Sequence, residues 1–251
     1  MAQRNSDRDE VIVELVQKIR RRHKVMGGRK LFYCLEADMA RMEGPLGRDK
    51  FFDILRRSDL LVKRRRRYAR TTQSRHRFRV HKNLLQQLSI KAPHQAWVSD
   101  ITYVRLDHDQ FAYLFLITDA YSRKIVGWEV SKSLGLQGAM RALQKAVRQC
   151  PDTGSLIHHS DRGFQYCSNQ YIDKLRAKSI RISMTEGGNC YENAMAERVN
   201  GILKTEYGLD ETFSDVGKAM RSAREAISSY NEYRPHLSLK MKTPAAIHAA
   251  R

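Results

Sequence analysis

A nearly continuous apolar run, Phe111–Thr118, limits the fold of this chain more than any other feature of its sequence. The run is far too short to span a bilayer, but it suits a strand that is buried on both faces. Such a strand needs further layers of structure on both sides of its sheet. Two more strands are expected beside it, at Trp97–Val104, which is rich in β-branched and aromatic residues, and at Lys124–Val130.

Helical and extended segments then alternate along the chain. Leu136–Cys150 has apolar residues at helical spacing, with Met140, Leu143 and Val147 on one stripe. The segments predicted after it are a strand at Ser155–His159, a helix at Asn169–Ala177, a strand at Ile180–Ser183 and a helix at Tyr191–Tyr207. Three antiparallel strands followed by this alternation predict an α/β fold, a mixed five-stranded sheet with flanking helices.

Positive charge is concentrated in the first third of the chain. The 251 residues carry 46 Lys and Arg against 27 Asp and Glu, a net charge of +19. Residues 1–90 alone hold 24 basic and 10 acidic side chains, so most of the excess lies there. A field of this sign favours a polyanion as partner, because each neutralised phosphate releases condensed counterions.

The basic third divides into helices and a charge run. Helices are predicted at Asp7–Val25, Arg29–Met42 and Arg48–Arg57, joined by Gly-containing turns that are compatible with a helix-turn-helix. Five consecutive cations follow, Lys63 and then Arg64, Arg65, Arg66 and Arg67. A flexible linker is one interpretation of this run, and a contact with the DNA backbone is the favoured one, because adjacent cations repel one another unless a polyanion neutralises them.

These patterns predict four consecutive parts. Residues 1–62 form a small basic, helix-turn-helix-like DNA-binding segment, and residues 63–93 form a basic linker. Residues 94–210 form the α/β core, and residues 211–251 extend it with helices. Composition excludes other classes: no signal peptide opens the chain, and the four cysteines show no CxxC spacing. We therefore expect a cytoplasmic globular protein with reduced thiols, without zinc fingers and without a membrane partner.

Three acidic residues occupy places where the predicted sheet meets solvent. Asp100 lies in the first strand, Asp161 directly follows the fourth, and Glu197 lies on the helix after the fifth. On that helix Asn193, Asn200 and Lys204 share a polar face with Glu197. Carboxylate oxygens without thiolate clusters favour Mg²⁺ or Mn²⁺ over Zn²⁺.

Several motifs, in order and at the right spacing, resemble the integrase core of DDE transposases. They are Trp97–Tyr103, Ile117–Trp128, His159–Gly163, Asn193–Glu197, Lys204–Glu206, Tyr230–His236 and Thr243–Pro244. The gap of 35 residues between Asp161 and Glu197 is also similar to that family's signature. The chain most resembles the downstream reading-frame product (OrfB) of the insertion sequence three (IS-three) family, strongly over residues 97–246 and loosely over residues 20–82.

The resemblance implies a ribonuclease H-like fold with Asp100, Asp161 and Glu197 as the catalytic and metal-binding triad. It implies a DNA contact for Lys204, near the cleaved end, and the polar face shared on that helix extends this expectation to Asn193 and Asn200. Asp119 fits the shared pattern at a turn, where a structural role is expected. His159 and Arg234 have two interpretations each: packing inside the core, or contact with DNA.

The implied reaction is cleavage and strand transfer at insertion-sequence ends, supported by two Mg²⁺ or Mn²⁺ ions. Implied partners are double-stranded DNA, both transposon ends and target, other copies of the chain on that DNA, and the product of an upstream reading frame, alone or fused. The expected location is the nucleoid of a bacterial cytoplasm. Two alternatives stay open: a hydrolytic nuclease of the same fold, and a DNA-binding regulator without turnover.

Overall fold

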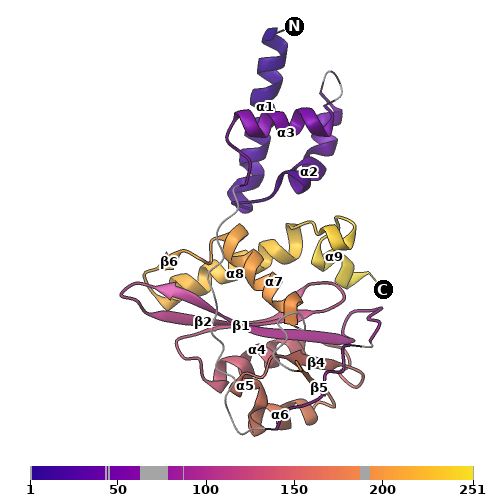
Figure 1. The fold of residues 1–251 in the computed structure, drawn as a ribbon, viewed down its shortest axis with the longest axis vertical. Helices are drawn as coiled ribbons and strands as arrows, with labels where there is room; N and C mark the ends of the chain where they lie inside the picture. The colour runs from indigo at the N-terminus through magenta and orange to yellow at the C-terminus, as the bar shows by residue number, and fades with distance from the viewer. Residues whose placement is uncertain are drawn as a thin grey trace.

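The computed structural model describes residues 2–42, 44, 46–62, 79–86, 88–186 and 193–250, with side chains from residue 7 onward. A central sheet lies between two layers of helices, and a separate group of three helices precedes it (Figure 1). The helices are α1 (Ala2–Arg22), α2 (Gly28–Ala40), α3 (Arg48–Arg57), α4 (Leu136–Arg148), α5 (Phe164–Cys167), α6 (Asn169–Arg176), α7 (Ala194–Tyr207), α8 (Val216–Tyr233) and α9 (Pro244–Ala249). The strands are β1 (Ala96–Leu106), β2 (Phe111–Asp119), β3 (Ile125–Ser131), β4 (Ile157–Ser160), β5 (Arg181–Met184) and β6 (Thr212–Phe213).

The sheet has the order β3-β2-β1-β4-β5. Strands β1, β2 and β3 are antiparallel neighbours, whereas β4 runs parallel to β1 and β5 runs parallel to β4. The predicted mixed five-stranded sheet is thereby confirmed. The two-residue strand β6, which pairs with the end of β1, was not predicted, because so short a segment has no periodicity to detect.

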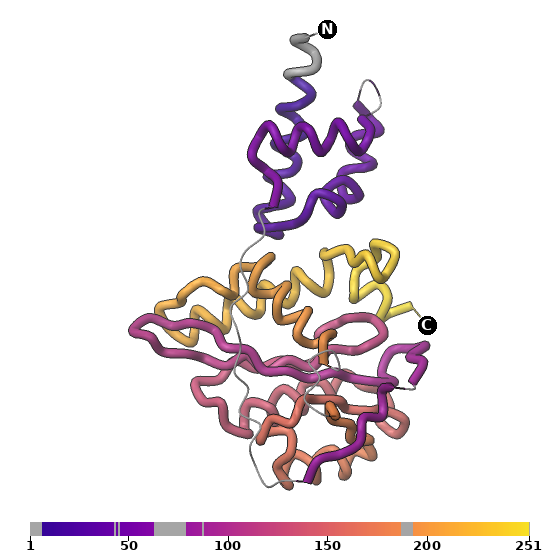
Figure 2. Tube along the Cα trace, in the orientation of Figure 1, coloured from indigo at the N-terminus to yellow at the C-terminus, as the bar shows by residue number. Residues whose placement is uncertain are grey.

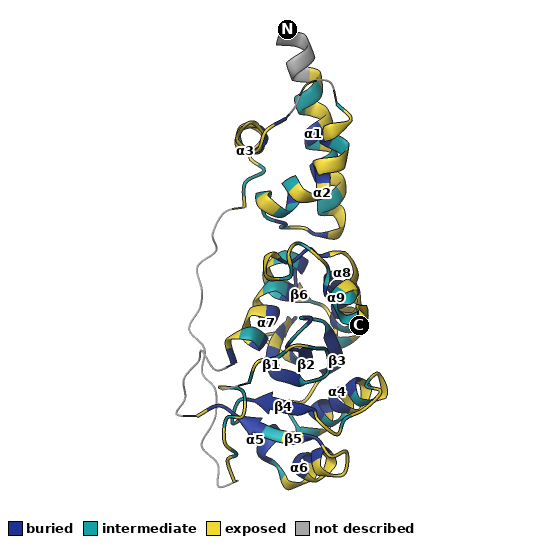
Figure 3. Cartoon of the chain, turned by 90° about the vertical axis from the view of Figure 1, so that its right-hand side faces the viewer, coloured by how far each residue is buried: buried dark blue, intermediate teal, exposed yellow. Residues whose placement is uncertain are grey.

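Strand β2 is buried on both of its faces, as its apolar run requires. Leu114 and Leu116 pack in a cluster with residues of α7 and α8. Phe115 and Ile117 point the other way, into a cluster formed with α4 and α6. The exposed surfaces of the helices face outward while the strands between them are buried (Figure 3).

The three N-terminal helices have a hydrophobic cluster of their own. Ile12 and Val16 of α1, Leu31 of α2, and Phe51 and Leu55 of α3 are fully buried in it. Helix α3 has the predicted bounds, and α2 is within two residues of them. Helix α1 begins at Ala2, before the predicted start, and ends at Arg22 rather than Val25.

This helical group contacts the far ends of α7 and α8. His23 and the hydroxyl of Tyr207 are 2.9 Å apart in a buried hydrogen bond. Glu206 accepts two hydrogen bonds from Arg234 at 2.7 Å and lies 3.2 Å from the ammonium of Lys30. Figure 2 traces the Cα path of the described residues of this group and of the core.

Residues 83–86 and 88–90 fall within the predicted linker but pack against the core. Leu85, Leu88 and Ile90 join a cluster that includes Val98 of β1. The backbone N–H of Leu84 donates to Ser183 Oγ of β5 at 2.8 Å. The charge run Arg64, Arg65, Arg66 and Arg67 lies outside the described residues.

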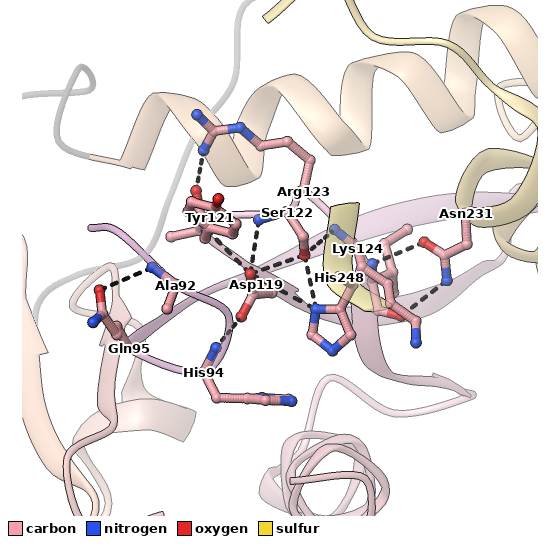
Figure 4. A network of polar contacts seen from close by, with 12 residues as sticks. Ala92, His94, Gln95, Asp119, Tyr121, Ser122, Arg123, Lys124, Asn231 and His248 are labelled. Carbon is pink, nitrogen blue, oxygen red and sulfur yellow. Dashed lines mark hydrogen bonds and ion pairs between the residues drawn. The ribbon is translucent and has the colours of Figure 1, made fainter. Parts of the chain in front are cut away.

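The turn after β2 ties the C-terminal helix to the sheet (Figure 4). Asp119 is fully buried and accepts hydrogen bonds from the backbone of Tyr121, Ser122 and His94. The hydroxyl of Ser122 also donates to Asp119 and lies 2.9 Å from His248 Nδ1 of α9. Asp119 therefore has the structural environment expected for a turn residue. Nowhere in the described chain is a helix both apolar and long enough to cross a bilayer.

Candidate active site

Asp100 lies in the middle of the sheet, on the face of β1 that is covered by α7. Its side chain is only 5% exposed. One carboxylate oxygen accepts the N–H of Ile101 at 2.9 Å, and the other accepts the side-chain amide of Asn200 at 2.7 Å. These two bonds fix the orientation of the Asp100 carboxylate.

Asp161 follows β4 directly, and the strand register brings it next to Asp100. Ser99 and Ser160 are paired residues of the parallel strands β1 and β4, so the next residue on each strand is Asp100 and Asp161. The N–H of Gly163 donates to Asp161 Oδ1 at 3.0 Å, which holds the carboxylate over the turn that leads into α5.

Tyr166 of α5, just after Asp161 in the chain, is buried. Burial raises the pKa of its phenol well above the usual value, and the charges of Tyr171, Asp161 and Asp100 raise it further.

Glu197 lies in the first turn of α7, and its residue is exposed. Asn200 is one turn further along the same helix and bonds to Asp100, so α7 is anchored next to the two aspartates. Residues 187–192, which lead into α7, lie outside the described residues. Within the described part of the chain, no three acidic, His or Cys side chains are already gathered as a metal site.

The residues present nevertheless fit a hard cation. The side-chain carbonyl oxygen of Asn200 is buried and has no hydrogen-bond partner among the described residues, and the same holds for Asn193. A buried acceptor left without a donor costs about 1–3 kcal/mol, which a cation or a bound water relieves. The donor set of Asp100, Asp161 and Glu197 consists of oxygen ligands, as Mg²⁺ and Mn²⁺ require.

Two residues predicted to contact DNA have a different environment. Asn193 and Asn200 are 4% and 3% exposed, and their amides donate to the carbonyl of Ser99 and to Asp100. These amides bond to β1, on the side of α7 that packs against it, and their contact with DNA stays a prediction. Their spacing from Glu197 was visible in the sequence, but which side of α7 meets β1 was not. Lys204, on the same helix, is half-buried, and its contact with DNA stays a prediction.

His159 and Arg234, the two residues with two interpretations each, are both buried. His159 is fully buried, with Nδ1 2.8 Å from Ser183 Oγ, while His158 points to the opposite face and lies 2.7 Å from Ser99 Oγ. Arg234 is 4% exposed and paired with Glu206, an environment that suits packing, and the alternative contact with DNA stays a prediction.

Comparisons with known proteins agree with this architecture. Two family models described as "Integrase core domain" match residues 90–190 and 178–244. The chain is 35% identical over 214 residues to the "Insertion element IS600 uncharacterized 31 kDa protein" of Shigella sonnei, covering 84% of this chain and 78% of that protein. It is 38% identical over 153 residues to "Transposase InsF for insertion sequence IS3A" of Escherichia coli (strain K12), covering 61% of this chain and 53% of that protein.

A solved structure shares the fold at low identity. The chain is similar to a chain of a simian T-cell lymphotropic virus intasome in complex with PP2A regulatory subunit B56 gamma, with a TM-score of 0.53 and 16% identity. That match covers 90% of this chain and 72% of the other. The ribonuclease H-like fold is thus shown by structure, and the relatives identify the family. The matched region spans about half of InsF. The chain belongs to the IS3 family of insertion-sequence transposases, DDE enzymes with an integrase catalytic core.

Proposed function

We propose that this chain catalyses cleavage of DNA at the ends of an insertion sequence and transfer of the resulting 3′ ends to target DNA. The observation that carries the proposal is the parallel register of β1 and β4, which puts Asp100 and Asp161 side by side. The hydrogen bond from Asn200 to Asp100 then sets the helix that bears Glu197 against the same strand.

In this proposal Asp100, Asp161 and Glu197 hold two divalent ions, Mg²⁺ or Mn²⁺. When bound, such a pair would activate the attacking oxygen and stabilise the leaving oxygen of an in-line displacement at phosphorus. The protein's own part is to fix the carboxylates. Asn200 and the N–H of Ile101 orient Asp100, and the N–H of Gly163 orients Asp161.

Both steps are phosphoryl transfers with the same balance of bonds. In cleavage a water oxygen bonds to phosphorus, the bond from phosphorus to the 3′ oxygen breaks, and the water's proton is lost as the 3′ oxygen gains one. In joining, that 3′-hydroxyl oxygen bonds to a phosphorus of the target and displaces another 3′ oxygen. Neither step needs a covalent enzyme intermediate or a nucleotide cofactor.

The other parts of the chain have supporting roles. Residues 1–62 are proposed to bind transposon-end DNA, with the run Arg64–Arg67 and Lys204 contacting its backbone. Residues 63–93 connect that segment to the core at 94–210, and residues 211–251 complete the core. The enzyme is proposed to act on DNA in the bacterial nucleoid, as an oligomer and with the product of an upstream reading frame.

Incubation of the purified protein with Mg²⁺ and a labelled transposon-end duplex tests the proposal. Joined products are expected, and Asp100→Asn should abolish them while DNA affinity stays within about twofold. Asp109→Asn in the exposed β1–β2 turn makes the same substitution outside the site and should retain activity. Cut products without joining would favour the nuclease of the same fold. Binding without either product, unchanged by Asp100→Asn, would favour the regulator.

A further inference from the structure

A basic cleft opens at the edge of the sheet that is remote from Asp161. It lies between α4 and α8, beside the edge strand β3, and has a volume of about 540 Å³. Four cations line it, Lys124, Lys145, Arg148 and Arg224, against the single carboxylate of Glu232. The cleft therefore carries a net charge of +3.

Three of these cations have no carboxylate partner among the described residues. Lys145 is paired with Glu129 at 2.7 Å, and Glu129 also accepts from Arg141. The described part of the chain contains no ion pair for Lys124, Arg148 or Arg224. The carboxyl end of α4 adds only about half a negative charge, which is too little to offset them.

The edge of β3 is closed to a further strand. Asn231 of α8 accepts the N–H of Ile125 and donates to its carbonyl, at 2.9 and 3.0 Å. Gln149 and Lys145 of α4 donate to the carbonyls of Val126 and Trp128. Side chains thus already form hydrogen bonds with the backbone groups that a partner strand would use. A second copy docked here about a twofold axis would also bring its cations against these.

The cleft is also separate from the acidic site. Asp100, Leu116 and Trp128 are register partners across β1, β2 and β3, so the backbones of Asp100 and Trp128 are about 10 Å apart, two strand spacings. Helix α8 covers the sheet on the side of the acids. The phosphate that would react at the acids is therefore not the phosphate that would lie in the cleft.

We propose that this α4–α8 cleft binds the phosphodiester backbone of a second segment of double-stranded DNA. The inference rests on the proposed function only in taking DNA as the substrate. Lys124, Arg148 and Arg224 supply the charge, and the exposed hydroxyl of Ser228 supplies a neutral donor for a phosphate oxygen.

Binding measurements on paired variants test the proposal. Arg148→Gln/Arg224→Gln removes two cations of the cleft, and Lys174→Gln/Lys178→Gln removes two exposed cations on and just after α6. Anisotropy titrations with a labelled duplex at several salt concentrations should show the slope of log K against log[salt] falling by about 2 for the cleft variant. The affinity should fall about 30-fold at roughly 0.15 M salt, and the α6 control should stay within about threefold. Equal losses in both pairs would overturn the proposal.

Lysine footprinting on the full-length wild-type chain gives a readout independent of folding. Lys124 should be protected from acylation when duplex is added, whereas Lys174 and Lys178 should stay reactive. Protection of Lys124 without DNA, together with a doubled mass in sedimentation, would instead show that the cleft is an interface between copies. That result would contradict the proposal. Asp100→Asn separates this result from the proposed function, because it should abolish joining and keep the footprint.

Discussion

The side-chain amide of Asn200 on α7 donates to the carboxylate of Asp100 on β1 at 2.7 Å, across 100 residues of sequence. Both residues are buried, so the bond is shielded from competing water. It connects the helix that carries Glu197 to the strand that carries the first acid. Asn200 is therefore a positioning residue, and the predictions below begin with it.

Replacing Asn200 by Ala should weaken the metal response of the enzyme. Without the amide, the carboxylate of Asp100 loses its orientation, and losses of about 10–100-fold in metal affinity or activity are typical for such supporting bonds. Strand transfer measured against Mg²⁺ concentration should show a raised requirement for the metal. Gly201→Ala, at the next and exposed position of α7, serves as the control. An unchanged Mg²⁺ profile in Asn200→Ala would contradict the positioning role.

Replacing Arg234 by Leu should strongly destabilise the contact between the ends of α7 and α8. The guanidinium makes two hydrogen bonds to Glu206 in a largely buried pair, and removal of one buried partner typically costs about 3–5 kcal/mol. Urea unfolding should show the loss. The control Glu211→Gln breaks the exposed pair with Lys24 and should cost less than about 1 kcal/mol. Equal effects of the two changes would show that burial does not govern this contact.

Stability should fall as the pH drops from about 6.5 to 4. Burial lowers the pKa of His23 to about 4, below the 6.5 of an unfolded histidine. Because the unfolded chain binds the proton first, the folded state loses stability on the order of 3 kcal/mol from this group across that window. His23→Gln keeps hydrogen-bonding capacity toward Tyr207 and removes the titration. Chemical unfolding at stepped pH should show a shallower decline for this variant, and an identical decline would rule out the assignment.

Two glycine substitutions should have opposite effects. A Cβ on Gly127 would overlap the carbonyl oxygen of Ala142, where α4 crosses β3 closely. Gly127→Ala should therefore destabilise the fold by about 1–3 kcal/mol through overpacking. Gly201→Ala meets no atom within 4 Å in a helix interior and should stabilise by about 0.5–1 kcal/mol. Thermal unfolding of both proteins gives the comparison, and a shift of the same sign in each would refute the packing argument.

Local patterns in the sequence determined the elements of this protein and their class. The apolar run of β2 required cover on both faces, and the structure supplies it through Leu116 on one side and Phe115 on the other. The bounds of α3 follow from its glycine and its amphipathic spacing. The order and spacing of the acids and helices also pointed to the family, because both can be read along the chain without knowing how it packs.

Tertiary structure alone decided which groups meet. Nothing local to Asn200 shows that its amide faces Asp100 rather than DNA, since that depends on how α7 is rotated against β1. The pairing of Arg234 with Glu206, and the gathering of Lys124, Arg148 and Arg224 around one cleft, likewise join segments far apart in the chain. Periodicity shows which face of a helix or strand is apolar. Which other element packs against that face depends on how the whole chain packs.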